Sequence, residues 1–151
     1  MVDVGGKPVT RRTATAEGRV RVAASVADAI RADRVKKGSV LEVARLAGMM
    51  AAKRTDELIP LCHSLPLDGV TVDLALHDTE LRITATATCT GTTGVEMEAY
   101  TAVTVAALTV VDMTKAVDPS PVIEGVRLLE KTGGKRGHWR AEGQGGGQGG
   151  G

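Results

Sequence analysis

The sequence predicts an α+β domain in which an antiparallel sheet is covered on one face by two long helices. Apolar and polar residues alternate over 70–76 and again over 81–87, which predicts a β-hairpin with one face on a core. Apolar residues recur at helical spacing over about 39–55, and residues 97–113 are apolar on nearly every face of a helix predicted over about 93–115. Both segments open with a capping-box pattern. The 151 residues are sufficient for one domain that needs neither disulfides nor a metal to fold.

The first part of the chain is predicted to contain an arm, a strand and a short helix. Residues 1–18 are polar and rich in Thr and Arg, so we expect an extended arm without a core face of its own. Residues 19–24 alternate polar and apolar side chains, which is typical of a half-buried strand. A short helix is predicted over about 25–34, and the longer helix over 39–55 follows it.

The remaining elements follow from apolar patterns and from the Pro and Gly residues between them. The segment 58–67 contains two prolines but many apolar side chains, so we expect a packed loop that forms a pocket wall. The hairpin comes next, and the helix behind the 93–96 pattern should be buried on several sides. A last strand is predicted over 122–129. The Gly/Gln-rich segment 143–151 is expected to be a flexible tail, which leaves 1–142 as a single domain.

The composition excludes several classes of function. Lys and Arg number 19 and Asp and Glu number 18, so the net charge of +1 does not attract nucleic acid or anionic membranes. With no Phe, one Tyr and one Trp, the chain lacks the aromatic side chains on which single-stranded nucleic acids stack. Two cysteines without a CxxC motif do not predict a zinc site. We see no signal-peptide core or membrane span, and we expect a cytoplasmic protein.

Asp112 and Lys115 are the most informative polar pair. They lie three residues apart on a predicted helix, and they share a face at the end of a long apolar segment. One interpretation is a routine surface ion pair, worth about 0–1 kcal/mol. The other is a carboxylate and an amine that exchange protons with a ligand, which requires pKa values shifted toward neutrality. Spacing alone favours the ion pair.

Basic residues at the ends of predicted elements are a second candidate group. They either complement helix dipoles or converge on one polyanion such as a nucleoside triphosphate, and spacing does not decide between these interpretations. The residues are Arg11, Arg12, Lys36, Lys37, Lys53, Arg54, Lys131, Lys135 and Arg136.

The remaining polar residues carry weaker signals. His63 directly follows Cys62, and neighbours in an extended loop point to opposite sides, so a hydrogen-bonded histidine is favoured over a metal ligand. Glu96 is explained as the last residue of a capping box, whereas Glu98 has no such explanation. Both charges would repel a phosphate from the N-terminus of this helix.

Six blocks of the sequence are long, uncommon in composition, and collinear from Met1 to about residue 140. They are MVDV at 1–4, AAKRT at 51–55, LIPLCH at 58–63, TGVEMEA at 93–99, DMTKAV at 112–117 and VRLLEKTGGK at 126–135. These blocks resemble the cyclic pyranopterin monophosphate synthase family of molybdenum-cofactor biosynthesis. The resemblance implies a ferredoxin-like fold and a homohexamer, built as a trimer of dimers with its site at a subunit interface.

The resemblance also implies an activity. The substrate would be (8S)-3′,8-cyclo-7,8-dihydroguanosine 5′-triphosphate, and the lyase would release pyrophosphate and cyclic pyranopterin monophosphate. No cofactor is required, although Mg²⁺ could accompany the triphosphate. The resemblance gives catalytic roles to Asp112, Lys115 and Lys37. Substrate-binding roles fall on Leu61, Cys62, His63, Met97, Glu98, Lys53, Arg12, Lys131 and Asp3.

A geometric consequence concerns Glu98 and Asp112. On one continuous helix they lie about 21 Å apart, so one small ligand cannot easily contact both. We therefore predict that they reach one ligand from different chains. Two alternatives stay open: a non-catalytic nucleotide- or pterin-binding protein on the same fold, and a structural oligomer in which the apolar helix makes only subunit contacts.

Overall fold

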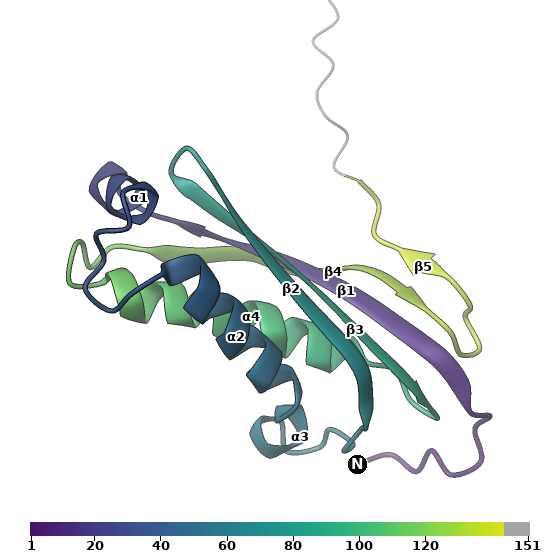
Figure 1. Ribbon diagram of the computed structural model, residues 1–151. Helices are drawn as coiled ribbons and strands as arrows, with labels where there is room; N and C mark the ends of the chain where they lie inside the picture. The colour runs from purple at the N-terminus through teal and green to yellow at the C-terminus, as the bar shows by residue number, and fades with distance from the viewer. Residues whose placement is uncertain (144–151) are drawn as a thin grey trace, which may run out of the picture.

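The computed structural model describes residues 1–143, and in it one antiparallel sheet packs against helices on a single face (Figure 1). This arrangement confirms the α+β expectation and agrees with the ferredoxin-like description. The elements are β1 (Thr10–Arg21), α1 (Ala24–Arg31), α2 (Val40–Ala52), α3 (Thr55–Leu58), β2 (Leu67–His77), β3 (Glu80–Gly91), α4 (Glu96–Thr114), β4 (Val122–Thr132) and β5 (Trp139–Arg140). Apart from Gly143, the tail expected over 143–151 lies outside the described residues.

The sheet has the strand order β2-β3-β1-β4-β5, and every neighbouring pair is antiparallel. The predicted hairpin is confirmed as β2 and β3, with Val72 paired to Ala85 and Leu74 to Ile83. All four side chains are buried on the helix side of the sheet. The turn between these strands places Asp78 at φ +56°, in the left-handed region that Asp tolerates better than most residues.

The prediction of an extended arm over 1–18 is wrong from Thr10 onward. Residues 10–18 form most of β1, which is the central strand and pairs with both β3 and β4. The small side chains of Ala14 and Ala16 alternate with threonines and are fully buried under the helices. Alanine adds little apolar area, so this alternation is weak in the sequence even though it lies at the centre of the sheet.

The helices α2 and α4 lie side by side across the sheet, and α4 is confirmed to be buried on several sides. Gly48 allows their close approach, because a Cβ at this position would stand 2.8 Å from the backbone oxygen of Ala102. Neither expected capping box forms a side-chain hydrogen bond in the structure. The N-cap residue of α4 is Val95, and the Glu96 carboxylate instead accepts a hydrogen bond from a lysine on β4.

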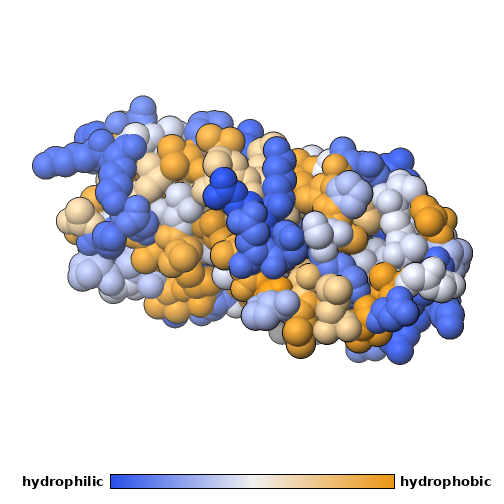
Figure 2. Space-filling model, turned by 90° about the horizontal axis from the view of Figure 1, so that it is seen from below, coloured by the Kyte–Doolittle hydropathy of each residue, from blue (hydrophilic) through white to orange (hydrophobic). Residues whose placement is uncertain are grey.

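The outer face of the two helices remains partly apolar, as Figure 2 shows from the helix side of the molecule. Val43, Leu46 and Met50 on α2 are exposed, and so is Leu108 on α4; Leu46 and Leu108 expose more than half of their surface. No helix in residues 1–143 combines the length and the apolar character that crossing a membrane requires.

Candidate active site

The candidate residues form two groups at opposite ends of α4. The helix has 19 residues and is therefore about 28 Å long. Its N-terminal end adjoins two pockets that share Gly94 and Glu96, which we name the cationic pocket and the apolar pocket. Its C-terminal end carries the lysine–aspartate cluster, formed by Lys37, Asp112 and Lys115.

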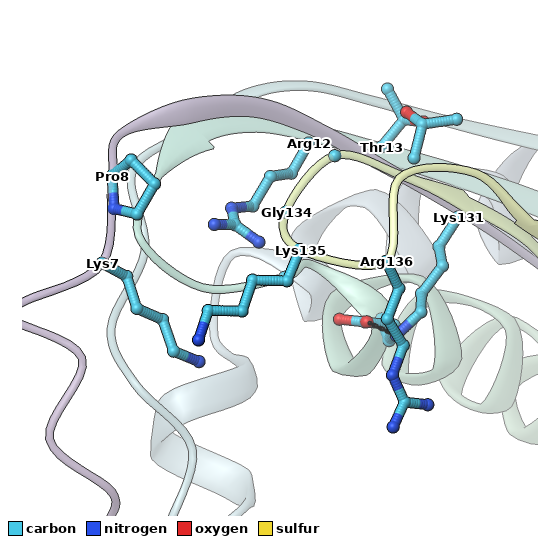
Figure 3. A pocket seen from close by; sticks show the side chains of 12 residues that line it. Lys7, Pro8, Arg12, Thr13, Lys131, Gly134, Lys135 and Arg136 are labelled. Atoms are coloured by element: carbon cyan, nitrogen blue, oxygen red, sulfur yellow. Dashed lines mark hydrogen bonds and ion pairs between the residues drawn. The ribbon is translucent and has the colours of Figure 1, made fainter.

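The cationic pocket is a cavity of about 270 Å³ where the start of β1, the end of β4 and the β4–β5 turn meet. Among residues 1–143, five basic residues and one acidic residue line it: Lys7, Arg12, Lys131, Lys135, Arg136 and Glu96. Figure 3 shows the side chains of Lys7, Arg12 and Lys135 extending into the same space. Cations that converge in this way suit a ligand with several phosphate groups.

Arg12 is built into the wall of this pocket. It lies on the helix side of β1 and is only 8% exposed, and its Nε donates a hydrogen bond to the Gly91 carbonyl over 3.1 Å. The turn after β4 covers it closely, with Gly133 at φ +94° and Gly134 at φ +79°. A Cβ on Gly133 would stand 2.4 Å from the backbone oxygen of Arg11, so only glycine fits there.

Lys131 and Glu96 form an ion pair at the boundary of the two pockets. Lys131 Nζ donates to Glu96 Oε1 over 2.8 Å, and both side chains are about two-thirds buried. Burial pushes the pKa of Glu96 upward, but the contact with Lys131 outweighs it and the net pKa is lowered. Glu96 is therefore ionised at neutral pH. The interpretation of Glu96 as a capping residue missed this role, because its partner is 35 positions away in the sequence.

The apolar pocket has a volume of about 290 Å³ and lies on the other side of Glu96. Its wall includes Leu61, Cys62, His63 and Met97, so the segment 58–67 does form a pocket wall as expected. Leu65 and Leu67 pack against the core but Leu61 is 72% exposed, so the expectation of a packed loop is met by only part of the segment in a single chain.

His63 connects this pocket with the N-terminus of the chain. Its Nε2 is 2.6 Å from the backbone oxygen of Val2, which agrees with the prediction of a hydrogen-bonded histidine. Asp3 lies next to this contact, is exposed, and accepts a hydrogen bond from the Gly5 N–H over 2.8 Å. Asp3 lines neither pocket in the single chain.

Glu98 is the most unusual acid in the structure. It is 3% exposed, and its Oε2 has no hydrogen-bond partner among residues 1–143. Burial and, secondarily, the Glu96 charge raise the pKa of Glu98. Its carboxylate also adds to burial in raising the pKa of the thiols of Cys62 and Cys89, so these groups lie near one another. An acid in this setting can hold a proton that an exposed carboxyl group would lose.

The lysine–aspartate cluster lies at the other end of α4. Asp112 Oδ1 accepts a hydrogen bond from Lys115 over 2.6 Å, and Oδ2 accepts one from Lys37 over 2.8 Å. Lys37 also donates to the backbone oxygen of Asp112 over 3.1 Å. All three side chains are about half exposed, beside an open hollow that Leu108 helps to line.

The two lysines set the protonation of Asp112. Hydrogen bonds from Lys115 and then Lys37 lower the pKa of Asp112 from 3.8 to about 2. Proton exchange with a ligand would require a pKa shifted toward neutrality, and in the single chain the pKa of Asp112 is shifted the other way. At neutral pH this carboxylate is an anion that contacts two ammonium groups, so a proton for the ligand would come from another group.

The structure thus brings together Arg12 and Lys131 but places Lys37 far from both. Lys53 is exposed just beyond the end of α2 and lines neither of the two pockets. Lys135 and Arg136, which the sequence placed among the candidate polyanion-binding cations, line the cationic pocket, whereas Lys7 was not among those candidates. Within residues 1–143, no three or more His, Cys, Asp or Glu side chains gather in a way that could hold a metal ion.

Comparison with known proteins shows the family to which the chain belongs. The model of the MoaC family matches residues 1–134. A protein of Streptomyces coelicolor named cyclic pyranopterin monophosphate synthase is 60% identical over 139 residues, which cover 92% of this chain and 82% of the relative. A protein of the same name from Novosphingobium aromaticivorans is 57% identical, covering 93% of this chain and 90% of the relative. These matches confirm the resemblance seen in the sequence, and the chain belongs to the MoaC family.

Proposed function

We propose that this protein converts (8S)-3′,8-cyclo-7,8-dihydroguanosine 5′-triphosphate into cyclic pyranopterin monophosphate, with release of pyrophosphate, in molybdenum-cofactor biosynthesis. The reaction makes it a phosphorus–oxygen lyase. One observation carries the proposal: a pocket with five cations adjoins an apolar pocket, and the two meet at Glu96. The names of the relatives support the product.

The two pockets match the two halves of such a substrate. Arg12 and Lys131 would bind phosphate oxygens in the cationic pocket, while the base would lie against Met97 and His63 in the apolar pocket. Each cavity is near the lower end of the range for small-molecule sites, roughly 300–1,000 Å³, so the ligand would occupy both. The described residues offer no metal cluster, and a Mg²⁺ ion would enter on the triphosphate.

The lysine–aspartate cluster would act on this ligand from a neighbouring subunit. A substrate oxygen attacks the α-phosphorus, the bond to the β-phosphate oxygen breaks, and pyrophosphate leaves with the electron pair. Lys37 and Lys115 would stabilise the growing negative charge, with Asp112 orienting them. Glu98 would supply or accept a proton in the rearrangement of the ring system.

Association of subunits is part of the proposal. A complete site needs both ends of α4, which lie about 28 Å apart in one chain. The apolar outer face of α2 and α4, with Leu46 and Leu108 exposed, is a surface that a second copy would cover. We propose a homohexamer, a trimer of dimers, with sites between subunits. Because the substrate derives from GTP, we place the reaction in the cytoplasm.

The first experiment compares turnover of the cyclised dihydro-GTP by the parent protein and by its Lys115→Ala and Lys131→Ala variants. We expect each variant to lose activity by orders of magnitude, while the control Arg82→Ala, on the exposed side of the sheet, stays within about twofold. Binding of the substrate without turnover by a folded parent would favour a non-catalytic nucleotide- or pterin-binding protein. Unchanged activity and binding in both variants would favour a structural oligomer.

A second experiment tests whether the site is shared between subunits. Lys115→Ala and Lys131→Ala damage opposite ends of α4, so a mixed oligomer contains some sites with both halves intact. After unfolding and refolding of an equal mixture, we expect about one quarter of the parent activity. The cationic pocket of a site is intact with a probability of about one half, its lysine–aspartate cluster is intact with the same probability, and an active site needs both. A mixture as inactive as its two components would contradict a shared site.

A further inference from the structure

The turn between β4 and β5 forms one side of the cationic pocket. It begins after Thr132 and carries Lys135 and Arg136, which both line the cavity. The match to the MoaC family model ends at residue 134, immediately before these two cations.

The turn is held in a defined position at both ends. Gly133, Gly134 and Gly137 all have positive φ, which bends the backbone tightly over the pocket. Beyond the turn, β5 pairs with β4, and the Ala141 N–H donates to the Leu129 carbonyl over 2.8 Å.

Glu130 fixes the same hairpin through its side chain. Its Oε1 is 2.6 Å from His138 Nε2, and its Oε2 accepts a hydrogen bond from Arg140 over 3.3 Å. The contact with His138, followed by that with Arg140, lowers the pKa of Glu130, so the carboxylate stays ionised and keeps both partners. The two cations on the turn are therefore presented from an anchored loop.

The cations on the turn also differ from the others in their partners. Lys131 donates a hydrogen bond to the Glu96 carboxylate, and Arg12 Nε donates one to the backbone carbonyl of Gly91. Within residues 1–143, Lys135 and Arg136 have no acidic side chain within 4 Å, and neither has Lys7 across the cavity. Three unneutralised cations around one cavity repel one another until an anion with several charges binds among them.

We propose that Lys135 and Arg136 bind the outer phosphates of a polyphosphate ligand, so that the turn over residues 133–137 is a clamp that distinguishes triphosphates from monophosphates. That the ligand is a polyphosphate follows from the cations alone, whereas the statement that this polyphosphate is the substrate rests on the proposed function. Arg12 and Lys131, at the wall of the cavity, would hold the phosphate nearest the base. Guanidinium and ammonium groups on the turn would then contact the phosphates that leave as pyrophosphate.

The test measures binding of inorganic tripolyphosphate and of GMP to the full chain by titration calorimetry. The double variant Lys135→Ala/Arg136→Ala should bind tripolyphosphate at least about tenfold more weakly, because one hydrogen bond between charged groups is worth about a factor of ten. Its affinity for GMP should change by less than about twofold, because GMP has no outer phosphates. Unchanged tripolyphosphate affinity would refute the clamp, and an equal loss for GMP would refute the discrimination.

A matched control removes the same charge far from the pocket. Arg21 and Arg82 are well exposed, and Arg21 lies nine residues from Arg12 along β1, about 30 Å away. The variant Arg21→Ala/Arg82→Ala should keep the parent affinity for tripolyphosphate; a similar loss would show a general effect of net charge and refute the clamp. A second variant, Lys135→Glu/Arg136→Glu, should abolish tripolyphosphate binding.

The clamp and the proposed function can fail separately. If the parent binds tripolyphosphate through the turn but does not turn over the cyclised dihydro-GTP, the clamp stands and the proposed function is wrong. If the parent turns over this substrate and the turn variants bind tripolyphosphate normally, the function stands and the clamp is wrong. A parent that binds no tripolyphosphate would overturn the clamp whatever its turnover.

Discussion

Replacing Glu96 by glutamine should tighten the binding of tripolyphosphate to the cationic pocket. The Glu96 carboxylate contacts Lys131 over 2.8 Å and is the one acid that lines this cavity in the part of the chain that the structure describes. It neutralises a cation that a phosphate would otherwise use, and it also repels that phosphate. Glutamine keeps the shape of the side chain and removes the charge, so only the electrostatic contribution changes.

The size of this effect follows from the geometry of the pair. A phosphate oxygen on the far side of Lys131 Nζ would stand about 5 Å from the carboxylate, where two unit charges repel by about 0.8 kcal/mol in water and about 3 kcal/mol at an effective dielectric constant of 20. Both side chains retain about one-third exposure, and salt screens the repulsion further. We therefore expect about 1 kcal/mol, a roughly fivefold gain in affinity.

Titration calorimetry at low and at physiological salt measures this gain directly. The gain should shrink as salt rises, since the repulsion it removes is screened. Lys131→Met gives the matched comparison and should weaken binding, because it removes the cation and leaves the acid. Weaker tripolyphosphate binding by Glu96→Gln at both salt concentrations would refute the reasoning, and would mean that the carboxylate is needed to orient Lys131.

Three other predictions follow from the structure. Lys37→Ala should move the pKa of Asp112 from about 2 part of the way back to 3.8, as read by carboxyl NMR, and an unmoved pKa would show that Lys37 does not contact it in solution. Burial raises the pKa of Glu98 in the folded state above 4.5, its ordinary value. Above pH 4.5 the unfolded chain therefore loses this proton more readily, and the free energy of unfolding falls as pH rises. Glu98→Gln should therefore raise Tm more at pH 8 than at pH 4, and an equal change at both would show that the acid is not desolvated. Gly48→Ala should lower the free energy of unfolding by about 1 kcal/mol, since overpacking against Ala102 exceeds the gain in helix propensity; chemical denaturation showing higher stability would mean that the two helices can separate slightly.

Strong local patterns in the sequence predicted most of the fold. The β2–β3 hairpin was predictable because apolar residues repeat at a clear period of two, and the buried helix α4 because its residues are apolar on nearly every face. The part of β1 up to residue 18 was missed because its core face is built largely from Ala14 and Ala16, and such small side chains among polar residues resemble a linker. The two-residue strand β5 was also missed, since it is held by contacts to Glu130 that no local pattern reveals.

In the candidate site, too, features with a local sequence pattern were predictable and features that depend on long-range contacts were not. The segment 58–67 was predictable as a pocket wall, because apolar residues between two prolines must pack or bind. The pairing of Glu96 with Lys131 was not, since the residues come from different elements and meet only in the folded chain. The spacing of Asp112 and Lys115 did predict an ion pair, but it could not show that Lys37 completes it from the other side.

The position of Trp139 gives this protein an optical probe. Trp139 is the single tryptophan of the chain, and on β5 it stands opposite Lys131 at the edge of the cationic pocket. Its ring is partly exposed, so its emission depends on the water and the charges around it. Anion binding and local opening of the hairpin should therefore both change the natural fluorescence. Ligand occupancy can then be followed without a label, during turnover as well as at equilibrium.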